Sequence, residues 1–228
     1  MAGMHALDTG RVRGIVFDLW NTLAYNDHHP NPIIALARAF GVLGQPGWTK
    51  VIERGMMRQR LPAIREGVAS LSNVTGVTLS AEETDSLCRL WQVACTRTRL
   101  FDDVPAALSS LTRRFRLGLL SNTQSFDLEF LEHPELGRRF HARTLSCDEG
   151  LLKPDPALFL RMAERLSLAP SHLLMVGDNL KDDVLAAEAV GMQALLVRRR
   201  EAPLSFQEQQ PDREPLRSLA PIVSAFGR

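Results

Sequence analysis

The feature that most constrains the fold is a set of short, continuously apolar segments, each followed by polar residues. The first is Gly-Ile-Val-Phe at 14–17, and it stops at Asp18. A strand that is apolar at every position has both faces covered, which is typical of a parallel sheet between two layers of helices. Segments of the same character follow at 115–120, 142–146, 173–176 and 194–197.

Helical patterns separate the later apolar segments. Asp155 followed by Pro156 is typical of a helix start, with an N-cap acceptor before a proline at the first helical position. A second helix is expected over about 180–190 and should stop at Gly191, a residue type that commonly follows a helix. Strands that alternate with helices indicate an α/β fold with a doubly wound parallel sheet.

The stretch 25–99 interrupts this alternation. Ser80 and Glu83 have the spacing of a capping box, and apolar residues including Trp91 follow at helical spacing. We expect Trp91 to pack in the core of this unit rather than to contact a ligand. The sequence therefore predicts an all-helical domain at 25–99, inserted into a main domain made of 1–24 and 100–228. A further short helix is expected near 216–226.

The charge balance offers no case for a polyanionic partner. The chain has 27 lysines and arginines against 26 acidic residues, which gives a formal net charge of +1. We therefore expect neither nucleic acid nor a membrane surface as a partner. The run Arg198-Arg199-Arg200 is more typical of a solvated strand end than of an anion site. The sequence does not indicate an oligomeric state.

The cysteines and the apolar runs favour the cytoplasm. Cys88, Cys95 and Cys147 are odd in number and share no CxxC spacing, so no disulfide framework is expected. No apolar segment precedes Arg11, and we expect no signal peptide. No run reaches the ~20 apolar residues of a membrane span.

Polar residues at the ends of the predicted strands point to one site, because ligands of open α/β sheets bind beyond the carboxyl ends of the strands. These residues are Asp18, Ser121 with Asn122, and Asp178, while Lys153 precedes the helix after the third strand. Each alone is compatible with a turn or a helix cap. Together they suit nucleophilic displacement at an anionic centre: a carboxylate attacks, a hydroxyl and a lysine bind charged oxygens, and further carboxylates hold a hard divalent cation.

Four segments resemble the motifs of the haloacid dehalogenase (HAD) superfamily, in the order in which that family has them. The first is similar to DxDxT followed by an apolar residue, and the last to GDxxxxD. The resemblance covers about 13–24 and 101–197 and implies a core of strand order 3-2-1-4-5, with 25–99 where the family has its helical C1 cap. The matching segments are 17–23, 119–123, 150–159 and 176–183.

The resemblance implies roles for the residues at the reacting centre. Asp18 takes the position of the nucleophile and also of a metal ligand. Ser121 and Asn122 take positions that bind the transferring group, and Lys153 takes the position that neutralises this group and orients the nucleophile.

The resemblance also implies Mg²⁺ as the cofactor. Asp178 matches a direct ligand, and the backbone carbonyl of Trp20 matches another. Asp183 matches a residue that holds the ion indirectly or through water. Asp182 lies where the family often has asparagine, so its role stays open.

The departure from the family pattern is Trp20. The family's phosphatases have aspartate at this position, which protonates the leaving oxygen and then activates water. Indole has one weak N–H donor and no site that accepts a proton at neutral pH. Loss of a general acid or base typically costs ~10²–10⁴-fold in rate. Asp27, His28 or His29, just beyond this motif, could substitute, since imidazole exchanges protons near neutral pH; an exposed linker is the simpler interpretation.

Three hypotheses follow. The favoured one is an Mg²⁺-dependent phosphatase that acts on a small phosphorylated metabolite through an aspartyl-phosphate at Asp18, slowed by Trp20. The second is a degenerate family member that binds a phosphorylated ligand or a protein partner without turnover. The third is a 2-haloacid dehalogenase, in which the family has an aromatic residue two places after the nucleophile and uses no metal. The sequence does not identify the substrate.

Overall fold

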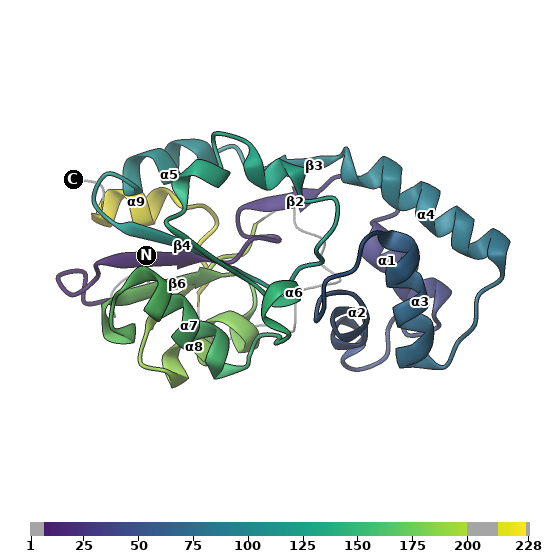
Figure 1. The fold of residues 1–228 in the computed structure, drawn as a ribbon. Helices are drawn as coiled ribbons and strands as arrows, with labels where there is room; N and C mark the ends of the chain where they lie inside the picture. The colour runs from purple at the N-terminus through teal and green to yellow at the C-terminus, as the bar shows by residue number, and fades with distance from the viewer. Residues whose placement is uncertain (1–6, 200–213, 227–228) are drawn as a thin grey trace.

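The computed structural model describes residues 7–199 and 214–226. Its centre is a five-stranded parallel sheet of order β5-β4-β1-β6-β7, which is the predicted order 3-2-1-4-5. This confirms the predicted α/β fold, with β1 in the middle (Figure 1). The strands are β1 Gly14–Phe17, β4 Arg116–Ser121, β5 Ala142–Leu145, β6 Leu173–Gly177 and β7 Gln193–Leu196.

Both faces of the sheet are buried, as the continuous apolar segments predict. Ile15 and Phe17 point into one hydrophobic cluster, and Val16 between them points into another. This alternation follows from the two-residue period of a strand. Phe17 lies level with Leu119 and Val176, so β1, β4 and β6 end at the same edge of the sheet.

Helices cover the two faces. α5 (Val104–Leu111) and α9 (Ala220–Phe226) pack on one side, while α7 (Pro156–Leu166) and α8 (Ala186–Ala189) pack on the other (Figure 1). α7 begins as predicted, because the Asp155 side chain accepts a hydrogen bond from the backbone N–H of Ala157. Short elements at the strand ends are α6 Ser146–Glu149, η2 Glu129–Glu132, η3 Gly137–Arg139 and η4 Pro170–His172.

Three local expectations differ from the structure. The helix expected over 180–190 begins as a π-helix, η5 (Leu180–Leu185), before α8. The helix expected near 216–226 begins only at Ala220, because Leu216 instead bridges to Val197 beside the sheet. Arg199 was expected to be solvated but is 3% exposed, and it donates two hydrogen bonds to the Asp103 carboxylate. Arg200 lies outside the described residues.

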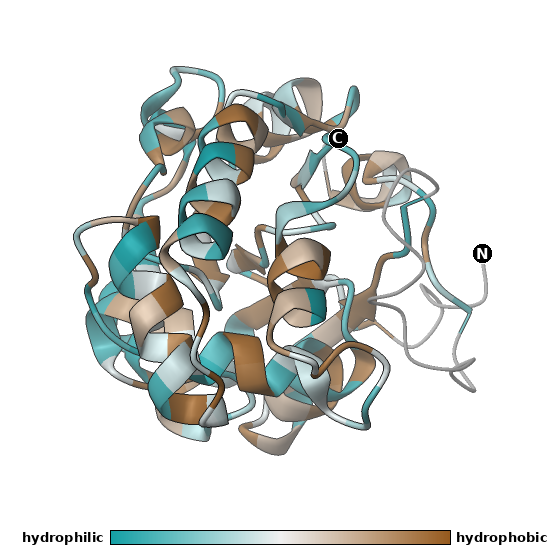
Figure 2. Cartoon of the chain, turned by 90° about the vertical axis from the view of Figure 1, so that its right-hand side faces the viewer, coloured by the Kyte–Doolittle hydropathy of each residue, from teal (hydrophilic) through white to brown (hydrophobic). Residues whose placement is uncertain are grey.

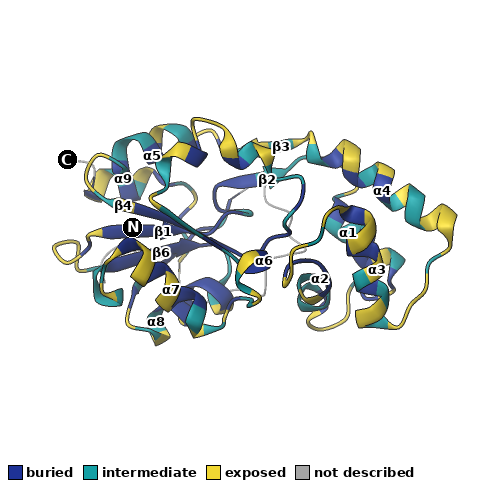
Figure 3. Ribbon diagram, in the orientation of Figure 1, coloured by how far each residue is buried: buried dark blue, intermediate teal, exposed yellow. Residues whose placement is uncertain are grey.

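A helical segment, which we define as residues 32–95, lies beyond the carboxyl ends of the strands (Figures 1 and 3). It has a hydrophobic core of its own that includes Phe40, Ile52 and Trp91. Viewed from this end of the molecule, its helices carry hydrophilic and hydrophobic residues on different faces (Figure 2). The helices are α1 Pro32–Ala39, α2 Trp48–Met56, α3 Ile64–Thr75 and α4 Ala81–Cys95.

The helical segment is joined to the main domain by two short strands that the sequence did not indicate. β2 (Ala24–Asn26) pairs antiparallel with β3 (Thr98–Leu100), so the predicted insert of 25–99 is helical only between these strands. The predicted capping box at Ser80 and Glu83 is present at the start of α4. Among the described helices, none combines the length and apolar character that a membrane crossing requires.

Candidate active site

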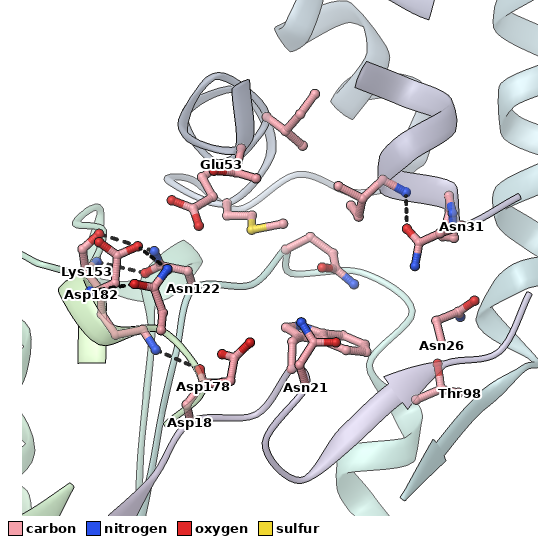
Figure 4. Close-up of a pocket in the computed structure, with 18 of the residues that line it drawn as sticks. Asp18, Asn21, Asn26, Asn31, Glu53, Thr98, Asn122, Lys153, Asp178 and Asp182 are labelled. Atoms are coloured by element: carbon pink, nitrogen blue, oxygen red, sulfur yellow. Dashed lines mark hydrogen bonds and ion pairs between the residues drawn. The ribbon is translucent and has the colours of Figure 1, made fainter. Parts of the chain in front are cut away.

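Asp18 lies at the carboxyl end of the central strand. Its backbone N–H donates to the carbonyl of Val176 at 2.9 Å, so the β1–β6 pairing extends to this residue. The side chain is 5% exposed and reaches the cleft between the sheet and the helical segment (Figure 4). The strand therefore fixes the backbone of Asp18 and leaves its carboxylate at the cleft.

Lys153 binds two carboxylates at once. Its Nζ lies 2.7 Å from Oδ1 of Asp18 and 2.5 Å from Oδ1 of Asp183. Its backbone N–H donates to Oδ1 of Asn122 at 2.8 Å, which ties the loop before α7 to the end of β4. Burial lowers the pKa of Lys153, but the two carboxylates outweigh this effect and hold the pKa above its usual value. The ammonium group is therefore charged and fixed.

The end of β6 brings two more carboxylates to the same place. Oxygen atoms of Asp18, Asp178 and Asp183 lie within 4.8 Å of one another. Oδ2 of Asp183 accepts a hydrogen bond from the backbone N–H of Asn179 at 3.0 Å. A Cβ atom at Gly177 would lie 2.3 Å from the Asp183 side chain, so this close approach requires glycine.

The π-helix η5 explains how neighbouring acidic residues both turn inward. The Asn179 side chain accepts hydrogen bonds from the backbone N–H groups of Lys181 and Asp182, at 3.0 and 2.9 Å. Asp182 and Asp183 are then 5% and 1% exposed. Single π-helical turns are rare and occur frequently at functional sites.

These carboxylates repel one another in the absence of a cation. Burial, opposed by Lys153 and reinforced by Asp183, raises the pKa of Asp18 to about 6. Burial, followed by the charges of Asp18 and Asp183, raises the pKa of Asp178 well above its usual value, although a hydrogen bond from Asn21 opposes the rise. One ammonium group does not balance three clustered carboxylates. The set therefore fits a hard divalent cation, which takes oxygen ligands.

The cleft holds a cavity of about 190 Å³ between the sheet and the helical segment. Of the predicted site residues, Asp18, Asn122, Lys153, Asp178 and Asp183 lie on its wall, together with Trp20 (Figure 4). Ser121 is fully buried at the end of β4 and does not lie on this wall. Its hydroxyl lies 3.4 Å from the carbonyl of Asn122.

Trp20 is fixed at the edge of the cavity. Its indole N–H donates to the Thr123 hydroxyl at 3.1 Å, and its ring packs on Phe130 with centroids 5.5 Å apart. The one N–H donor of this side chain is therefore already engaged by the protein.

The residues considered as substitutes for the missing acid lie off the cavity wall. Asp27 pairs with Arg97 and Arg99. The ring Nδ1 of His28 lies 2.9 Å from the carbonyl of Pro30, and His29 is exposed. The structure thus does not bring Asp27, His28 or His29 to the reacting centre.

The helical segment adds cavity residues that carried no motif. Lys50 on α2 is bonded to Oδ2 of Asp182 at 2.5 Å, to Oε2 of Glu53 at 2.8 Å and to the carbonyl of Lys153 at 3.0 Å. Glu53 lies on the cavity wall, and burial, opposed by Lys50, raises its pKa. Lys50 therefore links the helical segment to the loop that carries Lys153 and to η5.

A second link runs through Trp91. This residue is 6% exposed within the core of the helical segment, as predicted, but it also lies on the cavity wall. Its indole N–H donates to Oδ2 of Asp127 at 2.8 Å, and its ring contacts Phe126 with centroids 5.4 Å apart. Hydrophobic spacing identified Trp91 as a core residue but gave no sign of its contact with the main domain.

Comparison with known proteins establishes the family. Residues 12–191 match the family model described as haloacid dehalogenase-like hydrolase. The chain belongs to this family, and the predicted membership is confirmed.

The relatives include phosphatases. The chain is 31% identical over 201 residues to the phosphoglycolate phosphatase of Escherichia coli O157:H7, and the match covers 79% of each protein. It is 34% identical over 118 residues to the phosphoserine phosphatase of Thermus thermophilus, a match that covers 51% of this chain and 47% of that protein.

Solved structures share the fold with both branches of the family. A HAD phosphatase from Thermococcus onnurineus superposes with a TM-score of 0.62 at 20% identity, over 95% of this chain and 98% of that one. A 2-haloacid dehalogenase from Pseudomonas syringae superposes with a TM-score of 0.59 at 23% identity, over 94% and 97%. These likenesses concern the fold and do not distinguish the two activities.

Proposed function

We propose that this protein is an Mg²⁺-dependent phosphatase that hydrolyses a small phosphorylated metabolite through an aspartyl-phosphate at Asp18. The observation that carries the proposal is the cluster of Asp18, Asp178 and Asp183 around Lys153 on the wall of a small cavity. A dehalogenase that uses no metal has no need for Asp178 and Asp183 beside its nucleophile. The 31% identity to phosphoglycolate phosphatases supports the same choice.

In the first step, a carboxylate oxygen of Asp18 attacks the phosphorus atom and the ester oxygen leaves with its electron pair. Lys153 holds the attacking carboxylate at 2.7 Å and offers positive charge to the phosphoryl oxygens. Asn122, on the cavity wall just after β4, is proposed to bind these oxygens, whereas the Ser121 hydroxyl is buried off the wall and is not assigned this role. In the second step, water attacks the phosphorus atom, which releases inorganic phosphate and regenerates Asp18.

Asp18, Asp178 and the backbone carbonyl of Trp20 would hold Mg²⁺, with Asp183 supporting the site. When bound, the ion would neutralise the carboxylates and the incoming phosphate. The Asn179 N–H holds the Asp183 carboxylate by a hydrogen bond, and Asp178 directly follows the last residue of β6.

Trp20 determines which substrates turn over quickly. Its indole N–H is bound to Thr123, so the leaving oxygen takes its proton from solvent. We therefore propose slow turnover of alkyl phosphates and faster turnover of aryl phosphates, whose leaving groups need little protonation. The tryptophan in place of an acid at position 20 also supports the second hypothesis, a protein that binds a phosphorylated ligand without turnover. We place the protein in the cytoplasm, where its cysteines, all three free in the structure, remain reduced.

The test is a turnover panel of p-nitrophenyl phosphate, alkyl phosphates and 2-chloropropionate, each with Mg²⁺ and with excess chelator. We expect release of phosphate that requires Mg²⁺ and no release of chloride. Asp178→Asn should abolish the Mg²⁺-dependent turnover, and Asp102→Asn, which removes an exposed carboxylate near α5, should not.

Two results would overturn the proposal. Chloride release that persists in chelator would favour the dehalogenase. Binding of Mg²⁺ and phosphate by calorimetry without turnover of any ester would favour the binding protein.

A further inference from the structure

The charges on the cavity wall are distributed unevenly. Among the described residues that line the cavity, Lys153 is the only basic one, whereas six are acidic. Lys153 is committed to Asp18 and Asp183, at the end of the cavity formed by the sheet. The opposite end, where the leaving group of a substrate bound at Asp18 would lie, therefore has no cation of its own on the wall. The acidic residues are Asp18, Glu53, Asp127, Asp178, Asp182 and Asp183.

Lys50, just behind the wall, does not supply that cation. Its ammonium group is bonded to both Glu53 and Asp182, so these three residues together keep one negative charge. Asp127 adds a second negative charge. Its Oδ2 accepts a hydrogen bond from the neutral indole of Trp91 at 2.8 Å, and within the described part of the chain it forms no ion pair.

The other polar groups at this end are uncharged. Asn26 and Thr98 come from the strands that carry the helical segment, and Asn31 comes from the start of α1 (Figure 4). Trp20 and Trp91 add aromatic surface. The amide and hydroxyl groups both donate and accept hydrogen bonds, but they carry no positive charge, so they do not offset the negative charge of the carboxylates.

We infer that the leaving group of the substrate carries hydrogen-bond donors, either hydroxyl or ammonium, and no carboxylate. This inference rests on the proposed phosphatase function and names its substrate class. In a partly desolvated cavity whose wall also carries Asp127 and Glu53, a carboxylate on the leaving group would have no cation to pair with, and like-charge contacts reject a ligand effectively. The substrate then differs from phosphoglycolate, whose glycolate group bears a carboxylate, despite the 31% identity to phosphoglycolate phosphatases.

The test compares three phosphate monoesters with the same two-carbon skeleton: 2-phosphoglycolate, 2-hydroxyethyl phosphate and phosphoethanolamine. They differ in one group, which is a carboxylate, a hydroxyl or an ammonium. With Mg²⁺ present, we expect kcat/KM for one or both of the last two to exceed that for 2-phosphoglycolate by at least ~10-fold, given the usual cost of a like-charge contact. The ratio of kcat/KM for 2-hydroxyethyl phosphate to that for phosphoethanolamine shows whether the preferred leaving group carries a hydroxyl or an ammonium.

Asp127→Asn provides the residue-level test. Asparagine retains an oxygen that accepts from Trp91 and removes one negative charge, so the discrimination against 2-phosphoglycolate should shrink by several-fold. Glu164→Gln removes the same charge from the exposed face of α7 and should leave the discrimination unchanged. Binding of the three esters to the Asp18→Asn variant, measured by calorimetry, should rank them in the same order.

The outcomes separate the inference from the proposed function. A preference for 2-phosphoglycolate, or a discrimination that Asp127→Asn does not change, overturns the inference and leaves the phosphatase in place. Failure of all three esters and of p-nitrophenyl phosphate to bind or turn over overturns both.

Discussion

The sheet and the helical segment meet across one cleft but contribute different chemistry to it. The sheet contributes charged groups that bind one another, with Lys153 between Asp18 and Asp183. The helical segment contributes mostly apolar side chains, such as Ile33, Ile52 and Met57. Among the described residues of this segment that line the cavity, the one charged residue is Glu53, which is paired with Lys50. The proposed reacting centre therefore depends on where strands end, whereas the proposed selectivity depends on how separate helices pack against the sheet.

Because the two regions contribute different chemistry, substitutions in them should differ in their effect on stability. The charged groups at the sheet are mutually dependent, because removal of one member leaves another buried charge without a partner. Residues of the helical segment contact the main domain through individual hydrogen bonds, such as that from Trp91 to Asp127. A single substitution there removes a net ~1 kcal/mol of hydrogen-bond stability rather than the whole arrangement.

The largest expected effect is at the sheet. Asp18→Asn removes the attacking carboxylate, so turnover of p-nitrophenyl phosphate in Mg²⁺ should fall by at least roughly 10⁴-fold, as for removal of other nucleophiles. Asn31→Ala, at the N-cap of α1 on the cavity wall, should change kcat/KM far less. Steady-state kinetics on both variants measure the contrast, and an active Asp18→Asn protein would show that another residue carries the chemistry.

The next effect concerns stability against pH in metal-free protein. Burial raises the pKa of Asp18 from 3.8 to about 6, so the folded state binds more protons than the unfolded state between these values. Stability from this group therefore falls as the pH rises from about 4 to about 6, by an amount on the order of 1–3 kcal/mol. The pKa of Asp178 is also raised by burial and by the neighbouring carboxylates, so its contribution to stability changes with pH in the same direction.

Urea unfolding at pH 5 and pH 7.5, in chelator, measures this pH dependence. The difference in unfolding free energy between wild type and Asp18→Asn isolates the contribution of the cluster, because the other titrating groups are common to both proteins. Asp18→Asn should be relatively more stable at pH 7.5, and Mg²⁺ should restore wild type at that pH. Glu53→Gln, which removes a carboxylate already paired with Lys50, should change the pH dependence less. Identical pH dependence in wild type and Asp18→Asn would contradict the repulsion described here.

The sequence predicted the sheet and the reacting centre for the same physical reason. Apolar segments define strands that are buried on both faces, and in a parallel sheet the residue after each strand lies at one edge. Asp18, Asn122 and Asp178 needed nothing more than this rule to be placed together. The strand order came from the family resemblance, and the structure confirmed it.

The residues that the sequence did not indicate depend on contacts between distant segments. Lys50 resembles any lysine on a helix surface until α2 packs beside Asp182. Arg199 lies in the middle of a basic run that is typical of a solvated strand end. In the structure it is buried and donates a hydrogen bond to Asp103 at the start of α5. The inward turn of Asp182 follows from a π-helix that no local pattern specifies. Tertiary contacts between single pairs of residues produce no periodic pattern in the sequence, so they could not be predicted from it.

The smallest expected effect is at Trp20, which lies at the edge of the cavity between the sheet and the helical segment. Trp20→Asp places a carboxyl group where the family's phosphatases have their acid, so turnover of 2-hydroxyethyl phosphate should rise by ~10-fold. An aryl phosphate should respond less in the first step, because its leaving group needs little protonation. Loss of the indole also removes its contact with Phe130 and its hydrogen bond to Thr123, so unfolding free energies must accompany the kinetics. Trp20→Phe keeps an aromatic ring but lacks both the indole N–H and an acid. It should lose the stability of the hydrogen bond to Thr123 without any gain in rate. If Trp20→Asp folds but its turnover of both esters is unchanged or lower, the indole of Trp20 acts in ligand recognition rather than in place of the acid.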